Sequence, residues 1–443
     1  MEQQGNMKRN MGLMTAMSVV IGCVIGAGVF FKPYAIYQAT GGAPGLGMLS
    51  WVIGGLVSIF GALTFAEVAV LIPKTGGMVT YLGEVYDRKV GFLAGWMQMV
   101  IFYPAYIAGY GVKVGDELST MFGINLSTAI GIIVIVAVVL MNIVGSGAAG
   151  KFQVVTTICK LLPLFLIMII GLILGHSTEP IFTPMVAGGK STGTVLGSTL
   201  LAVLFAFEGW TNVGTIAGEM KDPAKDLPRA IVGGVGIIMA VYLLINIAYL
   251  KVIPAKELMN IESPGAAVAM KLFGKTGGTI VAVGIIISVI GAANGFLLAG
   301  SRVVYYLASQ HELPGSDSLA KLNKNQVPAN AIILVGTLAC LYSLLGQFDL
   351  LTNLGTFSCW IFYTLTFCCV IHLRRTKPEL DRPYKVPGYP VIPLLAILSG
   401  AFVIFSQLFL SGMSGTLMSL ASIGITLVGL PVYFAARKKY SQK

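Results

Sequence analysis

The stretch VVIGCVIGAGVFF, residues 19–31, lies inside the first long apolar segment of the chain. Three of its residues are glycines (Gly22, Gly26 and Gly28), and glycine disfavours a helix interior while letting other groups approach the backbone closely. Inside a bilayer, backbone groups freed by an interrupted helix need a protein partner or a polar cavity. The stretch therefore predicts either an unwound binding site around residues 26–28 or a close-packing face between helices.

Composition places the whole chain in a membrane. Of its 443 residues, 56% are hydrophobic and only 11% are charged, and the mean hydropathy is +0.85. Soluble domains carry about 25% charged residues. Residues 1–10 form a polar, basic tail that leads directly into a full-length apolar segment, so we expect no cleaved signal peptide. The sequence predicts an all-α polytopic membrane protein.

Long uncharged runs recur along the chain and predict about twelve membrane-crossing helices. The predicted spans are 13–37, 45–72, 90–114, 126–146, 152–175, 194–218, 229–252, 278–309, 329–346, 350–372, 391–410 and 416–436. A short amphipathic piece over 79–87 follows the second span, and a polar loop over 254–276 precedes the eighth.

The lysines and arginines are distributed unevenly between the two sides of these spans. If the N-terminus is cytoplasmic, the outer side receives only Lys113, Lys190, Lys251, Lys256, Lys271 and Lys275. Lys32 and Lys160 fall inside spans, and the rest of the 29 basic residues lie on the cytoplasmic side. The positive-inside rule then predicts cytoplasmic termini. The net charge of +11 reflects this topology and an attraction to anionic lipid rather than a nucleic-acid surface.

A second interruption is predicted in the sixth span, which reads VLFAFEGWTNVG over residues 203–214. A charged group such as Glu208 in mid-span costs about 2.5–3.5 kcal/mol, so it needs a partner or a functional reason. The first and sixth spans lie five apart and run in opposite directions. Two interrupted helices at matching positions predict inverted five-helix repeats over 13–175 and 194–372. Two further helices over 391–436 would follow, with cytoplasmic tails at 1–12 and 437–443.

The ends of the interrupted helices indicate what would bind between them. The backbone N–H groups of Ala27, Gly28 and Val29 would carry partial positive charge and suit a carboxylate. Carbonyls at the ends of the other half-helices would suit an ammonium. Both features together predict a free α-amino acid, and small apolar surroundings favour a small neutral one. The predicted binding residues are Val24, Ile25, Gly26, Ala27, Gly28, Val29, Phe205, Ala206, Phe207 and Glu208.

Enzymatic and cofactor chemistry find no support in the sequence. The six cysteines all fall in predicted spans, and the three histidines lie in or beside loops without forming a ligand cluster. No nucleophile elbow, phosphate-binding glycine loop or zinc-ligand spacing occurs. We therefore expect a protein that is not an enzyme and that needs neither a metal nor another cofactor.

Several motifs resemble a known family. They are IGAGVF (25–30), PKTGGMVTYLGEVY (73–86), FAFEGW (205–210), GEMKDPAKDLPRA (218–230) and YKVPGYPVIP (384–393). With these motifs the chain resembles, over its whole length, the amino acid–polyamine–organocation superfamily. Within it, the chain looks most like the L-type amino acid transporters, and among those the bacterial alanine–serine–cysteine exchangers.

The resemblance implies a LeuT-type fold in a bacterial inner membrane, with two inverted five-helix repeats and two C-terminal helices. It implies sodium-independent, obligatory exchange of small neutral amino acids. The carboxylate would lie on Ala27 and Gly28, the amine on carbonyls of Val24, Phe205 and Glu208, and the Phe205 ring would act as a gate. Eukaryotic members bond a heavy subunit through a cysteine between the third and fourth spans. Residues 114–125 contain no cysteine, so we expect no disulfide-linked partner.

Three further side chains are candidates for gating or coupling. Lys160, in the fifth span, either snorkels to the cytoplasmic interface or is a fixed cation bonded to the first interruption and to a hydroxyl such as Ser288. Sodium-coupled relatives of this fold hold a metal ion in that region, so a lysine there favours sodium independence. Proton coupling through Lys160 stays open, because a buried lysine shifts its pKa readily. Tyr242 either hydrogen-bonds the first interruption or only packs.

Three classes of function follow from the sequence. An amino acid exchanger is favoured, and a proton-driven amino acid symporter on the same fold is the alternative. A channel would show a repeated filter, a membrane enzyme a catalytic constellation, and a sensor an appended output domain. The sequence shows none of these three features.

Overall fold

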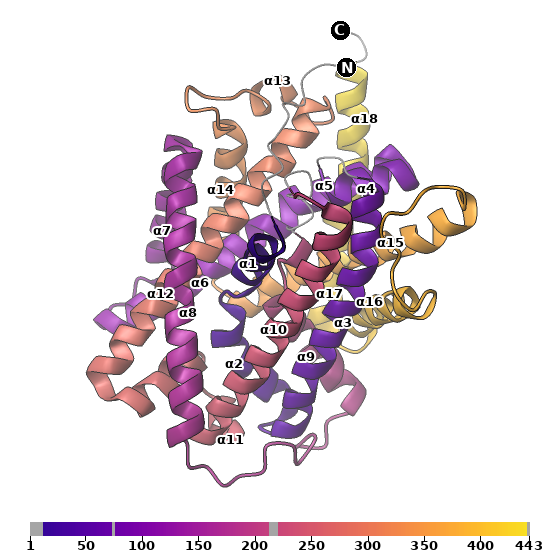
Figure 1. Cartoon of the computed structure of the whole chain (residues 1–443). Coiled ribbons are helices and arrows are strands. Elements are labelled where there is room, and N and C mark those ends of the chain that lie inside the picture. The colour runs from indigo at the N-terminus through magenta and orange to yellow at the C-terminus, as the bar shows by residue number, and fades with distance from the viewer. Residues whose placement is uncertain (1–11, 73–75, 212–219, 441–443) are drawn as a thin grey trace.

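The structure is a computed structural model that describes residues 12–72, 76–211 and 220–440. Within these ranges every regular element is a helix (Figure 1). The first half contains α1 (Leu13–Val24), α2 (Gly28–Thr40), α3 (Pro44–Leu71), α4 (Met78–Val85), α5 (Arg88–Met97), η1 (Gln98–Phe102), α6 (Tyr103–Phe122), α7 (Ser127–Val144), α8 (Ser146–Leu174) and α9 (Thr192–Ala206). The second half contains α10 (Pro223–Val252), α11 (Ala255–Leu258), α12 (Pro264–Ser309), α13 (Ser316–Leu319), α14 (Ala329–Ser343), α15 (Phe348–Thr376), α16 (Val391–Phe409), α17 (Gly412–Leu427) and α18 (Gly429–Tyr440).

The helices run between two faces of the molecule. Figure 1 shows α13 and the end of α18 at one face, called here the α13 face, and α11 at the opposite face, called the α11 face. Nine described segments are long and apolar enough to cross a membrane, and α1, α9 and α14 add shorter apolar helices. The segment α5–η1–α6 is one continuous run, as is α17–α18. The expected polytopic, all-helical architecture is therefore confirmed.

The first predicted interruption is present between α1 and α2. The helix α1 ends because Ile25 has an extended backbone conformation with ψ of 109°, and α2 begins only at Gly28. The close approach of another chain segment explains why glycine stands at position 28. A Cβ atom there would lie 2.4 Å from the Cα of Ala206, so any larger residue would push α2 and α9 apart.

The second predicted interruption is present where α9 ends at Ala206. Beyond it the backbone of Gly209 has φ of 118°, a conformation that L-residues other than glycine rarely adopt. The helix is therefore shorter than the predicted span over 194–218. The last part of that span, residues 212–219, lies outside the described residues.

Two other boundaries differ from the sequence-based expectation. The predicted polar loop over 254–276 is largely helical, because α11 and the first turns of α12 occupy it. Pro264 at the first turn of α12 suits a helix start, and the positive φ of Gly274 (67°) bends the chain so that α12 changes direction there. The third span is longer than predicted and stays helical to Phe122.

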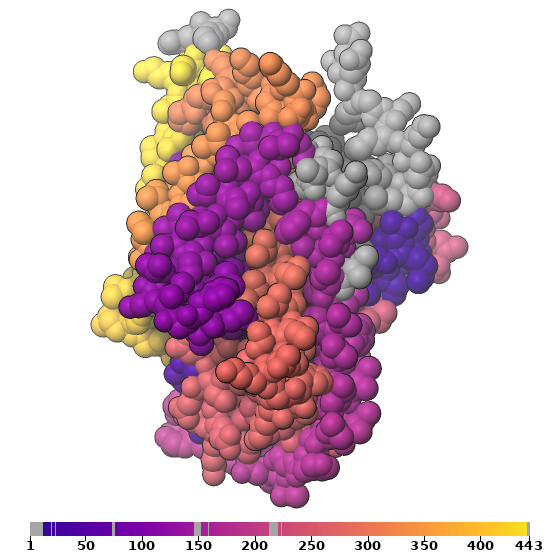
Figure 2. Space-filling view, turned by 90° about the vertical axis from the view of Figure 1, so that its left-hand side faces the viewer, coloured from indigo at the N-terminus to yellow at the C-terminus, as the bar shows by residue number. Residues whose placement is uncertain are grey.

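The outer surface of the helical bundle is apolar where a bilayer would surround it. Figure 2 shows one side of the molecule, where α7, α8 and part of α12 form the surface. Large apolar side chains that are exposed on these helices include Ile133, Leu140, Leu162, Ile169, Ile173 and Ile280. Exposed apolar surface of this extent is expected for helices in contact with lipid. Buried polar and charged side chains, among them Lys32, Lys160 and Glu208, lie inside the bundle.

Candidate functional site

The C-terminal end of α1 is held by a lysine from a distant part of the chain. The Lys160 ammonium, on α8, donates to the carbonyl of Gly22 at 2.6 Å and to that of Ile25 at 2.8 Å. Its side chain is 1% exposed, so it does not snorkel to a polar interface. The structure thus places a fixed positive charge against carbonyls that the interruption leaves without helical partners.

Ser288 on α12 does not take part in this arrangement. Its side chain is fully buried, but its hydroxyl has no hydrogen-bond partner among the described residues. The expected bond between Lys160 and Ser288 is therefore wrong for this conformation. The Lys160 ammonium donates instead to the carbonyls of Gly22 and Ile25 on the side of α1.

The N-terminal end of α2 leaves its backbone donors free. Within the described part of the chain, the N–H groups of Ala27, Gly28 and Val29 make no backbone hydrogen bond. The first bonds of this helix are donated by Phe30 and Phe31 to the carbonyl of Ala27. Free N–H groups at a helix start carry partial positive charge and can receive an anion. Because Gly28 lies directly against Ala206, these donors open beside the end of α9.

The side chain of Glu208 turns back toward its own interruption. Its Oε1 atom accepts from the hydroxyl of Tyr363, on α15, at 2.5 Å and from the backbone N–H of Gly209 at 3.2 Å. The backbone N–H of Glu208 donates to the carbonyl of Phe205 at 3.1 Å. A carboxylate held in this way ties the end of α9 to α15, rather than pointing freely into a binding space.

A single hydroxyl joins the two interruptions. The Tyr242 hydroxyl, on α10, lies 3.1 Å from the carbonyl of Ala206 and 3.3 Å from that of Val24. Its ring packs edge-on against Trp51 and Phe207, which places Phe207 on the side of α10. In this conformation the carbonyls of Val24 and Ala206 accept from Tyr242, and that of Phe205 accepts from the N–H of Glu208.

The Phe205 ring belongs to a layer of aromatic side chains. Ring centroids of Tyr106, Tyr110 and Phe348 lie 4.9, 6.2 and 5.6 Å from that of Phe205. Tyr106 and Tyr110 come from α6 and Phe348 from the first residue of α15. These ring contacts join Phe205, near the end of α9, to α6 and α15.

Lys32 is a functional candidate that the sequence analysis did not single out. It is completely buried on α2, and its ammonium donates to Asp349 at 2.6 Å and to Thr352 at 2.8 Å. The same ammonium lies 4.8 Å from the centre of the Phe205 ring and 4.9 Å from that of Phe348, a cation–π geometry. The signal that could have found it is the one that found Glu208, a charge within an apolar span.

A second set of ion pairs lies toward the α13 face. The carboxylate of Glu67, on α3, accepts two hydrogen bonds from Arg374 at 2.7 and 2.8 Å and one from the N–H of Val386 at 2.7 Å. Arg374 stands in the last turn of α15, and Val386 belongs to the loop before α16. The helix α15 is thus tied to α2 near one end, to the α9 interruption in the middle, and to α3 near the other end.

The described residues offer no metal-binding site. They contain no group of three His, Cys, Asp or Glu side chains that could hold an ion. The cysteines whose side chains are described are free thiols, namely Cys159, Cys340, Cys359, Cys368 and Cys369.

What the site offers instead is free N–H donors, carbonyl acceptors and a fixed lysine cation around two helix ends. Paired interruptions inside a multi-pass helical bundle define a membrane transport protein.

Comparison with known proteins identifies the family. A family model described as amino acid permease matches residues 11–430. A serine/threonine exchanger of Bacillus subtilis is 38% identical over 442 residues, which cover 99% of each chain. The human cystine/glutamate transporter is 30% identical over 98% of this chain and 86% of its own length. The mouse Asc-type amino acid transporter 1 is 30% identical over 97% of this chain and 81% of its own. The chain belongs to the amino acid permease family, whose members are membrane transporters and not enzymes.

Proposed function

We propose that the protein exchanges small neutral L-amino acids, such as alanine, serine and cysteine, across a bacterial cell membrane without sodium. The observation that carries this proposal is the meeting of α2 and α9 at Gly28 and Ala206, beside free N–H donors on one helix and carbonyl acceptors on both. An α-amino acid presents one anionic and one cationic group on neighbouring atoms. Such a ligand matches the partial positive charge of the N–H donors and the partial negative charge of the carbonyls.

The roles of individual residues follow from this placement. The α-carboxylate would bind the N–H groups of Ala27, Gly28 and Val29, and the ammonium would bind carbonyls of Val24 and Phe205. Tyr242 would release the Val24 carbonyl as substrate enters, and Phe205 would cover the substrate on the side of the α11 face. The buried Lys160 supports sodium independence, because its ammonium already satisfies the carbonyls of Gly22 and Ile25.

Topology and partners complete the proposal. The basic residues at the α13 face favour a cytoplasmic location for that face and for both termini. The connection between α6 and α7 contains no cysteine, so no subunit would be joined there by a disulfide. Two inverted repeats over 13–175 and 194–372 would then move relative to one another around the interruptions.

The test uses purified protein in sodium-free liposomes with equal pH on both sides. Uptake of radiolabelled alanine or serine is expected only into vesicles preloaded with unlabelled substrate, and added sodium should not change the rate. Protein-free vesicles loaded in the same way are the control. Uptake into empty vesicles that rises with an inward proton gradient would overturn exchange in favour of proton symport. Absence of uptake with either amino acid would overturn the substrate class.

A further inference from the structure

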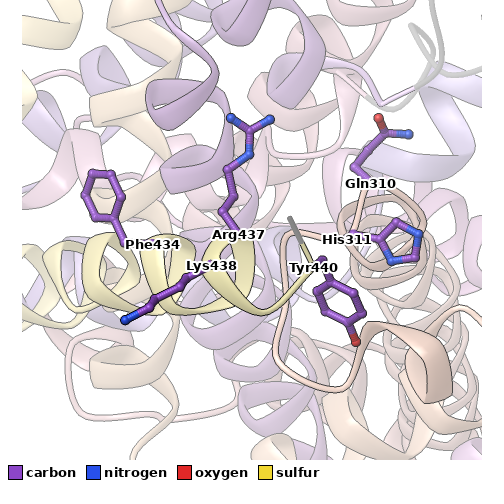
Figure 3. A pocket seen from close by; sticks show the side chains of 6 residues that line it. All are labelled: Gln310, His311, Phe434, Arg437, Lys438 and Tyr440. Carbon is purple, nitrogen blue, oxygen red and sulfur yellow. The ribbon is translucent and has the colours of Figure 1, made fainter. Parts of the chain in front are cut away.

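A hollow of about 500 Å³ lies at the α13 face, away from the helix interruptions. Figure 3 shows its lining, with Gln310 and His311 at the end of α12 opposite the last turns of α18. The remaining lining side chains are Phe434, Arg437, Lys438 and Tyr440, all on α18. We call this set of six residues the C-terminal hollow.

The walls of the C-terminal hollow are held in place by specific contacts. The rings of His311 and Tyr440 stack at a tilt with their centroids 4.8 Å apart. The Tyr440 hydroxyl donates to the Asp317 carboxylate at 3.3 Å. At the other end of α18, Tyr433 packs on Phe92 of α5 with a centroid separation of 5.0 Å. The hollow is therefore a built feature of the fold and not a gap beside a loose terminus.

Positive charge gathers around the hollow. The last turn of α18 contains Arg437, Lys438 and Lys439. From α5, the Lys89 ammonium lies 5.7 Å from the centre of the Phe434 ring. Basic residues at a helix C-terminus also stabilise the helix dipole, which is the plain structural explanation for the two lysines at the end of α18. That explanation does not account for a basic hollow with aromatic walls.

The acid beside Arg437 is already committed elsewhere. Glu312 is 2% exposed, and both its carboxylate oxygens accept from Arg88, at 2.5 and 2.6 Å. Arg437 forms no ion pair with any described carboxylate, and its guanidinium lies 5.5 Å from the centre of the Tyr433 ring. A guanidinium offers a planar fork of donors that matches phosphate geometry. Arg437 is thus a cation at the wall of the hollow that pairs with no anion in the part of the chain that the structure describes.

The hollow opens onto the apolar surface of the bundle. Leu427, Val428 and Phe434 are about half exposed along α17 and α18, as expected of side chains in contact with lipid. Phe434 also lines the hollow, so basic donors and the lipid-facing surface meet at one place. A soluble phosphate compound would use only the donors. A phospholipid would use both, with its phosphate at the cations and its acyl chains along the helix.

We propose that the C-terminal hollow binds the headgroup phosphate of an anionic phospholipid, with Arg437 as the donor, Lys438 adding positive charge to the lining and Phe434 against the first acyl methylenes. Clusters of lysine and arginine at a membrane boundary attract anionic lipids in general. The distinctive element here is the fixed wall formed by α18 and residues 310–317. The proposal requires only that the chain crosses a membrane and is independent of the amino acid that it transports.

The test measures lipid binding to the purified full chain by native mass spectrometry, with phosphatidylglycerol and phosphatidylcholine titrated separately. The double variant Arg437→Gln/Lys438→Gln should weaken phosphatidylglycerol binding roughly tenfold and leave phosphatidylcholine binding unchanged. The matched control is Lys321→Gln/Lys324→Gln, which removes two exposed charges from the same face outside the hollow. It should change phosphatidylglycerol binding by less than about twofold.

Three results would overturn the proposal. Equal losses in the two double variants would mean that overall charge, and not the hollow, attracts the lipid. Displacement of phosphatidylglycerol by millimolar inorganic phosphate would assign the hollow to a free phosphate compound. Unchanged binding in Arg437→Gln/Lys438→Gln would place the lipid elsewhere. Melting temperatures close to that of the natural chain would show that each variant is folded.

Discussion

The two helix interruptions are stabilised by opposite charges. At the end of α1, carbonyls of Gly22 and Ile25 accept from the ammonium of Lys160, which comes from α8. At the end of α9, the carboxylate of Glu208 accepts from Gly209 beside it and from Tyr363 on α15. The first interruption therefore depends on a cation from a separate helix, whereas the second carries its own anion.

The two interruptions therefore differ in what their charged side chains do: one keeps a fixed shape, and the other connects distant parts of the molecule. A cation supplied from α8 satisfies the carbonyls of α1 for as long as α1 and α8 stay together, so it fixes the shape of that end. The anion at α9 ties the interruption to α15, which also contacts Lys32 at one end and Glu67 at the other. The first arrangement would keep the proposed binding surface in shape, and the second would link it to both faces of the molecule.

The substitution Lys160→Met tests the role of the lysine at the first interruption and should have the largest effect on transport. It leaves the carbonyls of Gly22 and Ile25 without their donor in a medium that offers no water. Loss of charge-assisted bonds of about 2–3 kcal/mol should lower the exchange rate on the order of 100-fold. Initial rates of alanine exchange in liposomes provide the measurement.

The matched control for that substitution is Lys251→Met. The Lys251 ammonium also donates to a carbonyl of α8, that of Leu172 at 3.4 Å, but lies near the α11 face and away from the interruptions. It should exchange at nearly the natural rate. Equal losses in the two variants would mean that Lys160 contributes only general stability.

The contact between Glu208 and Tyr363 at the second interruption is tested by the substitutions Glu208→Gln and Tyr363→Phe, each made alone and then both together. Either change removes the charge-assisted bond between α9 and α15, so each should lower exchange about tenfold. The double variant should lose less than the two single effects combined, because the bond between Glu208 and Tyr363 is common to both changes. The Tyr363 hydroxyl also lies 3.1 Å from that of Thr211, so Tyr363→Phe has a small effect of its own. A double-mutant cycle in liposomes gives this coupling, and fully additive losses would show that Glu208 acts through another partner.

The hydroxyl that bridges the interruptions is tested by Tyr242→Phe. The ring contacts with Trp51 and Phe207 stay, and only the hydrogen bonds to Val24 and Ala206 are lost. A neutral hydrogen bond of about 1 kcal/mol corresponds to a roughly fivefold slower exchange. Tyr249→Phe on the same helix is the control, because the Tyr249 hydroxyl is buried with no partner in the described chain. A larger effect at Tyr249 than at Tyr242 would contradict the bridging role.

Of these substitutions, Lys32→Met is expected to change transport least. Asp349 is about one-third exposed, so water can solvate it once Lys32 is gone. The loss of the cation beside the Phe205 ring should loosen the aromatic layer and raise the apparent KM for external substrate about threefold. Lys256→Met is the control, since Lys256 is an exposed lysine of α11 and lies over no ring of the aromatic layer. An unchanged KM in Lys32→Met would remove Lys32 from gating.

The sequence was sufficient to locate the candidate site because its signals are local. Glycines at positions 26, 28 and 209 disfavour a regular helix wherever they occur, and Glu208 is conspicuous in any apolar window. The same local reasoning failed at residues 254–276, where polar composition hid the start of α12. It also passed over Lys32, because a lysine near the end of a predicted span is easily explained as snorkelling.

The class of the protein, its helices and the two places where they break follow from the sequence, since hydropathy and glycine act over a few neighbouring residues. Which charged side chains come into contact depends on the tertiary structure. Lys32 and Asp349 are 317 residues apart, Lys160 and Gly22 are 138 apart, and Tyr363 and Glu208 are 155 apart. Such pairs depend on how whole helices pack side by side, because a buried charge can be satisfied by any helix that reaches it. No window along the chain contains that information.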